Sequence, residues 1–232
     1  MSKTSSRVGV VIAGAGSSQR MGTDKLLLPV MGKPLLAWSV DVCQKCELLD
    51  QIVIVLGEEN LDSGEKLVTE RGWSKVSGVC LGGRRRQDSV QAGIKNLWDC
   101  EWVVVHDGAR PFLTFDLLRD GLEAARETGA SAAAVPSKDT VKLVDENGMV
   151  KETLFRQRLW MVQTPQIFRL NIITRAYEQV VDEVTDDASL VEQLGYKVRL
   201  YMGAYSNIKI TTPEDLALAE MIIGQKSQCE LE

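Results

Sequence analysis

The chain has 232 residues and a mass of 25.6 kDa, and its 44% hydrophobic and 25% charged residues are typical of a globular protein rather than a disordered or fibrous one. The formal net charge of −5 argues against a nucleic-acid partner. No apolar run approaches the ~20 residues of a membrane span, and the first residues lack a signal-peptide core, so we expect a cytoplasmic protein with no membrane partner.

Strands and helices alternate along the first half of the chain. Residues 8–13 form a continuous apolar run typical of a strand buried on both faces, and a loop rich in glycine and serine follows over residues 14–22. Apolar spacing and turn residues then predict strands at residues 51–56, 76–81, 102–105 and 130–135, and helices at residues 35–46, 88–98 and 117–127. This alternation indicates a parallel sheet with right-handed crossovers.

The second half begins with a hairpin. Residues 140–144 and 149–153 alternate in polarity and are separated by Asp145-Glu146-Asn147-Gly148, a strong turn signal. The remaining pattern predicts a strand at residues 163–168, helices at residues 171–184 and 188–194, a strand at residues 197–202, and a helix at residues 213–223. We therefore expect an α/β protein with a mostly parallel, twisted sheet and helices on both faces. Residues 1–232 would form one domain, with a projecting β-arm inserted at about residues 137–160.

The five cysteines are scattered and odd in number, which argues against the disulfide framework of a secreted protein. Cys43 and Cys46 form a C-x-x-C, but they fall within a predicted helix and no second pair follows. We interpret them as ordinary thiols, with a redox pair and a metal site as the alternatives.

The loop at residues 14–22 is the most informative segment for function. Glycines allow backbone N–H groups to approach phosphate oxygens, and a loop after a buried parallel strand lies at the sheet edge where ligands bind. Gln19 stands where a dinucleotide-binding fingerprint requires glycine or alanine, and no Gly-Lys-Ser/Thr of a P-loop is present. Instead the segment carries Arg20 and Lys25, two cations that could neutralise a triphosphate attacked at its α-phosphate.

This loop resembles that of nucleotidyltransferases that activate sugar and alditol phosphates, and five later motifs narrow the resemblance. In chain order they are GGRRRQDSV at residues 82–90, VHDGARP at 105–111, KDTVK at 138–142, LWMVQTPQ at 159–166 and NIKIT at 207–211. Together they resemble the 2-C-methyl-D-erythritol 4-phosphate cytidylyltransferase family, from residue 8 to about residue 223. The three consecutive arginines, Arg84 to Arg86, are more basic than is usual there.

The resemblance implies a Rossmann-like nucleotidyltransferase fold and a reaction in which the 4-phosphate of methylerythritol phosphate attacks the α-phosphate of CTP and pyrophosphate leaves. It implies roles for individual residues as well. Arg20 and Lys25 would be catalytic, Ala15 and Gly16 would also hold the triphosphate, and Gly83 and Ser89 would face the cytosine and ribose. The acceptor would be bound by Asp107, Arg110, Thr140, Arg156, Thr164 and Lys209.

A divalent metal and a partner subunit follow from the same resemblance. Asp107 would lie beside Mg²⁺ or another divalent cation, which favours hard oxygen ligands. The arm with Thr140 and Arg156 would reach across a homodimer to complete the neighbour's site.

Structural interpretations stand beside these roles. Ser89, near a helix start, could be only a hydroxyl of the N-cap region. Asp107 and Arg110 could form an ion pair that shapes their loop, and the arm residues could be plain hairpin surface. Residues 185–189 favour a helix N-cap over ligand binding. His106 precedes Asp107, and since neighbours on a strand point to opposite faces, we expect a structural role for this sole histidine.

Three alternative functions remain open from the sequence. The first loop also resembles molybdenum-cofactor nucleotidyltransferases, and ribitol 5-phosphate cytidylyltransferases share the later motifs. A non-catalytic nucleotide-binding or dimerisation module is the third, and the presence of both Arg20 and Lys25 argues against it.

Overall fold

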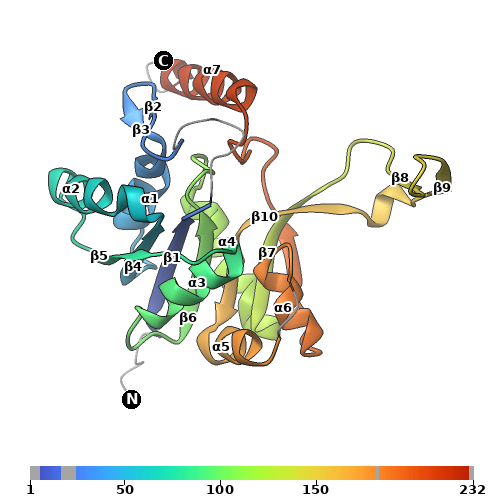
Figure 1. The fold of residues 1–232 in the computed structure, drawn as a ribbon, viewed down its shortest axis with the longest axis horizontal. Coiled ribbons are helices and arrows are strands. Elements are labelled where there is room, and N and C mark those ends of the chain that lie inside the picture. The colour runs from blue at the N-terminus through green and yellow to red at the C-terminus, as the bar shows by residue number, and fades with distance from the viewer. Residues whose placement is uncertain (1–5, 17–24, 181–182, 230–232) are drawn as a thin grey trace.

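The computed structural model describes residues 6–16, 25–180 and 183–229, and its centre is a seven-stranded sheet. The strands, in spatial order, are β11 (Arg199–Met202), β7 (Ala130–Pro136), β10 (Trp160–Arg169), β6 (Trp102–Asp107), β1 (Val8–Gly14), β4 (Gln51–Leu56) and β5 (Val76–Leu81). All neighbours in this sheet pair in parallel except β10, which runs antiparallel to both β6 and β7 (Figure 1). The expected α/β class with a mostly parallel sheet is confirmed.

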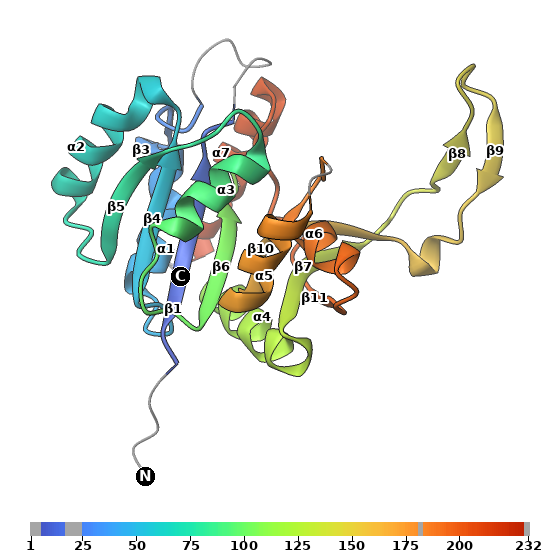
Figure 2. The same ribbon diagram turned by 60° about the horizontal axis from the view of Figure 1, so that its bottom comes forward.

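Helices cover both faces of the sheet because its central strands are apolar on both sides. Along β1, Val10 and Ile12 join one hydrophobic cluster while Val11 joins the other, as the two-residue period of a strand requires. The first cluster is covered by α1 (Leu35–Lys45), α2 (Leu61–Arg71), α4 (Phe115–Thr128) and α7 (Pro213–Cys229). The second is covered by α3 (Arg86–Lys95), α5 (Leu170–Gln179) and α6 (Asp187–Gln193) (Figure 2).

The arm is the far end of a long hairpin formed by β7 and β10. It carries β8 (Lys142–Val144) and β9 (Val150–Thr153), which pair antiparallel, and a short 3₁₀ turn, η2 (Arg156–Arg158). Asp145 closes the predicted turn: its Oδ1 accepts the backbone N–H groups of Asn147 and Met149, each at 2.9 Å, and Gly148 has a φ of +79°. The arm projects well away from the sheet (Figure 1).

Several predicted boundaries are wrong, and some elements were not predicted. The helix expected at residues 171–184 ends at Gln179, because Val180 is already extended. β6 continues through Asp107, so His106 and Asp107 lie on the strand rather than after it. Only Gly64 and Leu67 of α2 are buried, too thin an apolar stripe for its sequence to predict a helix. The other unpredicted elements are η1 (Glu58–Asn60) and the two-residue strands β2 (Pro29–Val30) and β3 (Lys33–Pro34).

Cys43 and Cys46 are free and buried. Cys43 packs in the hydrophobic cluster beneath α1, and burial raises the pKa of its thiol well above the usual range. These surroundings support the interpretation as ordinary core thiols.

No helix among the described residues is long and apolar enough to cross a membrane.

Candidate active site

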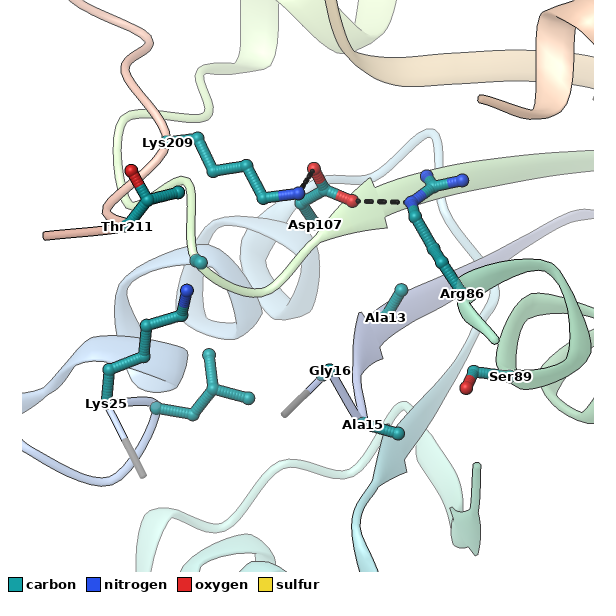
Figure 3. A pocket seen from close by; sticks show the side chains of 12 residues that line it. Ala13, Ala15, Gly16, Lys25, Arg86, Ser89, Asp107, Lys209 and Thr211 are labelled. Carbon is teal, nitrogen blue, oxygen red and sulfur yellow. Dashed lines mark hydrogen bonds and ion pairs between the residues drawn. The ribbon is translucent and has the colours of Figure 1, made fainter. Parts of the chain in front are cut away.

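A cavity of about 210 Å³ lies at the carboxyl ends of the central parallel strands, and we refer to it as the first cavity. The loop after β1 forms one wall with Ala15 and Gly16, and Ser89 of α3 lies nearby (Figure 3). Lys25, Asp107 and Lys209 line the opposite side. Parallel strands bring their carboxyl ends to one edge, which is why segments so distant in sequence meet here.

A second cavity, of about 390 Å³, lies over β10 and the start of α6. Its lining includes Arg110, Thr164 and Thr185. Three residues line both cavities, namely Arg86, Asp107 and Lys209. These charged side chains therefore form the wall that the two cavities share.

Asp107 is the centre of that wall. Its Oδ2 lies 2.8 Å from Nζ of Lys209 and 3.7 Å from Nε of Arg110, and its Oδ1 lies 3.2 Å from Nε of Arg86 (Figure 3). Burial by itself raises the pKa of Asp107, but Arg86, Lys209 and Arg110 outweigh it and hold that pKa well below its usual range. The carboxylate is thus ionised at neutral pH, and the ion pair with Arg110 considered from sequence is present.

Arg86 is held from two sides. Besides Asp107, it donates from Nη1 to Oδ2 of Asp187 at 2.8 Å, and the hydroxyl of Tyr177 donates to the other oxygen of Asp187. Burial disfavours the charged guanidinium, but Asp187 and Asp107 outweigh it and hold the pKa of Arg86 above its usual value. Arg86 is therefore a fixed cation.

His106 faces away from this cluster, as its position on β6 predicts. Its Nε2 lies 3.1 Å from the backbone carbonyl of Arg110, which can only accept, so Nε2 carries the proton. Its Nδ1 then accepts from the hydroxyl of Thr164 at 3.2 Å, and that hydroxyl oxygen accepts the backbone N–H of Asp107 at 3.0 Å. Complete burial lowers the pKa of His106 to about 4, so the ring is neutral and acts as a structural link.

Lys209 is positioned by the segment around it. The side-chain amide of Asn207 donates to the carbonyl of Thr164 at 2.8 Å, and the backbone N–H of Ile210 donates to Ala109 at 2.9 Å. One carboxylate oxygen of Asp215, in the first turn of α7, accepts the backbone N–H groups of Thr211 and Thr212. These contacts fix residues 207–212 against the end of β6.

Most of the described residues predicted for the site gather at these two cavities. Ala15, Gly16, Lys25, Ser89, Asp107 and Lys209 line the first cavity, and Asp107, Arg110, Thr164 and Lys209 line the second. Arg20 lies outside the described residues.

Of Gly83 and Ser89, which were both predicted to face the nucleotide, only Ser89 lines the first cavity. Gly83 is not among the lining residues of either cavity, and its backbone N–H donates to Oγ of Ser89 at 3.1 Å. Ser89 lies in the first turn of α3, in the N-cap region considered from sequence, and its hydroxyl bonds to the carbonyl of the N-cap residue Arg85 and to the backbone of Gly83.

Thr140 and Arg156 are exposed on the arm and line neither cavity of their own chain. Nη1 of Arg156 donates to the carbonyl of Lys138 at 2.8 Å. Asp186 caps α6 by accepting the backbone N–H of Ser189 at 3.1 Å, which confirms the N-cap expected at residues 185–189.

Sequence reasoning missed Arg86 and Thr211 as lining residues of the site, and Gly82 as a neighbour of its first loop. Arg86 was visible only as one of three consecutive arginines, and nothing local distinguishes it from its exposed neighbours. A Cβ at Gly82 would lie 2.1 Å from that of Ala15, so this glycine permits the close approach of two loops. Thr211 lies within a quoted motif and lines the first cavity.

Comparison with known proteins identifies the family. A family model described as 2-C-methyl-D-erythritol 4-phosphate cytidylyltransferase matches residues 8–225. The chain belongs to this family. It is 50% identical over 218 residues to the cytidylyltransferase of that name from Dehalococcoides mccartyi (strain CBDB1), covering 94% of this chain and 96% of the relative. The corresponding figures for the relative from Alkaliphilus metalliredigens (strain QYMF) are 43% over 238 residues, with 98% of each chain covered.

A solved structure supports the same assignment. The crystal structure of 4-diphosphocytidyl-2C-methyl-D-erythritol synthase from Anaerococcus prevotii matches with a TM-score of 0.86 and 32% identity, over 95% of this chain and 99% of that one. As a member of the 2-C-methyl-D-erythritol 4-phosphate cytidylyltransferase family, the chain is a nucleotidyltransferase of isoprenoid biosynthesis, and it transfers the cytidylyl group of CTP to 2-C-methyl-D-erythritol 4-phosphate. The molybdenum-cofactor and ribitol 5-phosphate alternatives are set aside.

Proposed function

We propose that the first cavity binds CTP, that the second binds methylerythritol phosphate, and that the two react across their shared wall. The observation that carries this proposal is the wall itself, since Arg86, Asp107 and Lys209 line both cavities. A glycine loop at the end of a parallel strand suits phosphate groups in the first cavity. Cations and hydroxyls suit a phosphorylated polyol in the second.

In the proposed step, an oxygen of the acceptor phosphate attacks the α-phosphorus of CTP in line, a new P–O bond forms, and pyrophosphate leaves. Negative charge builds on the α-phosphate and on the departing group, and Lys25 and Arg20 stabilise it. The attacking phosphate is already anionic at neutral pH, so no general base is required. His106 is neutral, buried and engaged by Thr164 and Arg110, which fits its absence from the chemistry.

We propose Mg²⁺, or another divalent cation, as the cofactor, with Asp107 and the phosphate oxygens of the nucleotide as its ligands. Magnesium in nucleotide enzymes is usually held by one or two carboxylates together with substrate phosphates. Asp107 fits, because it is ionised and lines the first cavity, and its other contacts are cations that the phosphates would also attract. A bound Mg²⁺ would neutralise phosphate charge.

We also propose a homodimer formed through the arm. Two short strands are too few to be stable alone and need a surface to pack on. The arm exposes five apolar side chains, which are Leu143, Val144, Met149, Val150 and Phe155. In this arrangement Thr140 and Arg156 enter the second cavity of the partner subunit and bind the acceptor there.

The substrates and the absence of a membrane-spanning helix among the described residues are consistent with a cytoplasmic enzyme, which we propose. We further propose that residues 1–232 act as one nucleotidyltransferase domain with the arm as an insertion.

The experiment that tests these assignments is a pyrophosphate-release assay. Methylerythritol phosphate, ribitol phosphate and molybdopterin are each offered with each of the four nucleoside triphosphates, with and without Mg²⁺. We expect release only with CTP and methylerythritol phosphate, and only with a divalent metal. Equal release with another acceptor, or undiminished release in the presence of a chelator, would contradict the corresponding part of the proposal.

A further inference from the structure

Arg86 has no role in the reaction assigned so far, yet it lies on the wall shared by both cavities. Two anions must meet at this wall, since the acceptor phosphate approaches the α-phosphate of the nucleotide. Their mutual repulsion is reduced by a cation between them. Lys209 and Arg86 are the cations that line both cavities among the described residues.

The guanidinium of Arg86 is held by a buried carboxylate behind it. Asp187 is fully buried at the start of α6, and its Oδ2 accepts from Nη1 of Arg86 at 2.8 Å. The hydroxyl of Tyr177, on α5, donates to Oδ1 of Asp187. Arg86, Tyr177 and Asp187 thus come from α3, α5 and α6, three helices on one face of the sheet (Figure 2).

The two carboxylates fix the orientation of the Arg86 guanidinium as well as its charge. Nε of Arg86 is directed at Asp107 and Nη1 at Asp187, so the planar fork is held at both edges. A lysine has one point charge on a flexible stem and could not satisfy both carboxylates in this way. Neither Asp187 nor Tyr177 lines either cavity, and a hydrogen bond links Asp187 to Arg86, which lines both.

We propose that Asp187 and Tyr177 are positioning residues that hold Arg86 at the wall between the two cavities, where its guanidinium contacts the phosphate groups as they react. The inference rests on the proposed function, because it takes the cavities as the two substrate sites. Displacing a reacting or stabilising group by about 1 Å can lower a rate by up to roughly 10²-fold. Loosening Arg86 should therefore lower kcat more than it raises the KM for either substrate.

The test is a double-mutant cycle on the full-length enzyme. Asp187→Asn keeps the shape of the side chain and removes its charge, and we expect kcat to fall about tenfold with KM for CTP changed less than about threefold. Arg86→Gln should lower kcat at least as much. If Asp187 acts through Arg86, adding Asp187→Asn to Arg86→Gln should change kcat by less than about twofold.

Asp41 provides a matched control. Its carboxylate accepts from Arg71 and from the indole N–H of Trp73, a guanidinium and an aromatic donor as at Asp187, and it also pairs with Lys33. Asp41 lies on α1 and lines neither cavity. We expect Asp41→Asn to lower the melting temperature while leaving kcat and both KM values as in the wild type. A purely structural role for Asp187 would give the same result as this control.

The proposal would be overturned if the fold-change in kcat of the double variant were the product of the two single fold-changes. That result would show that Asp187 acts independently of Arg86. Unchanged kcat in Asp187→Asn would overturn it as well. If Asp187→Asn does not fold, Tyr177→Phe replaces it in the cycle, since that change removes a single hydroxyl. Wild-type enzyme that releases no pyrophosphate from CTP and methylerythritol phosphate would instead contradict the proposed function, so the two failures are distinguishable.

Discussion

Asp107 and His106 are consecutive residues of β6 whose side chains leave the strand on opposite faces, and their surroundings differ accordingly. Three cations keep Asp107 ionised, while His106 is buried between the hydroxyl of Thr164 and a backbone carbonyl. Both side chains are buried, so the difference between their pKa shifts comes mainly from their partners. At this scale, hydrogen-bond partners and neighbouring charges decide which side chain can serve the reaction.

The buried histidine should make folding stability depend on pH. Its pKa is about 4 in the folded chain and about 6.5 when unfolded, so the unfolded chain binds the proton first as the pH falls. The stability that neutral His106 contributes is present above pH 6.5 and is lost towards pH 4, by about 3 kcal/mol in total.

Urea unfolding at pH 7 and pH 5, with His106→Gln beside the wild type, measures this effect. Between pH 7 and pH 5 we expect the free energy of unfolding to fall by about 2 kcal/mol more in the wild type than in the variant. The chain has no other histidine to account for this difference. If the difference in unfolding free energy between the two proteins is the same at pH 7 and pH 5, the pKa assigned to His106 is contradicted.

Removal of either predicted loop cation should act on the chemical step. We expect Lys25→Ala or Arg20→Ala to lower kcat by roughly 10²-fold or more, because charge grows on the phosphates in the transition state, while the melting temperature stays near that of the wild type. Lys66→Ala, whose side chain is 77% exposed on α2, is the control and should have normal turnover. Near-normal turnover in both loop variants would rule out their assigned roles.

At the scale of elements, the site depends on how loops are attached to rigid strands and helices. Residues 207–212 carry Lys209 and lead into α7, where Thr212 and Asp215 form a reciprocal cap. The same carboxylate also accepts from the backbone and hydroxyl of Thr211, which lines the first cavity. A helix cap therefore serves here to position the segment that we propose binds substrate.

Asp215→Ala should separate this positioning effect from simple loss of a cap. We expect a stability loss of about 1 kcal/mol together with a roughly tenfold fall in kcat/KM for methylerythritol phosphate, because Lys209 loses its fixed position. Thr114→Ala removes the cap of α4, where the hydroxyl accepts the N–H of Leu117, and should cost similar stability without the kinetic change. Equal kinetics in the two variants would show that the cap has no part in binding.

At the scale of the whole molecule, one chain does not bring all the predicted acceptor-binding residues together. Asp107, Arg110, Thr164 and Lys209 line the second cavity, whereas Thr140 and Arg156 lie on the projecting arm (Figure 1). The proposed homodimer resolves this separation, because a two-fold arrangement would carry each arm to the other subunit.

Mixing two inactive variants tests this arrangement. If Arg156 serves the neighbour's site, Arg156→Ala and Lys25→Ala should regain activity when their subunits exchange, because each mixed dimer has one site with both residues intact. Half of the dimers are mixed at equal concentrations, so recovery reaches at most about a quarter of wild-type sites. A mixture that stays inactive after exchange has been shown by pull-down of a tagged subunit would leave the arm with a structural role only.

The sequence by itself determined the features that depend on near neighbours along the chain. The apolar run of β1, the hairpin turn at residues 145–148 and the amphipathic spacing of α1 and α4 are local patterns, and the structure contains each of these elements. The ordered motifs also identified the family, and most of the described residues predicted for the site line one of the two cavities. Boundaries were less accurate because helix ends depend on capping contacts and packing.

Only the tertiary structure decided which charged groups meet. Arg86 and Asp187 are separated by 101 positions in the sequence, and Lys209 and Asp107 are also far apart along the chain. No spacing rule therefore predicts either pair. Gly82 lies against Ala15 through packing of two loops that only the sheet brings together. Short-range periodicity reflects the backbone geometry of a helix or strand, whereas these contacts depend on how the strands are ordered and how the helices pack on them.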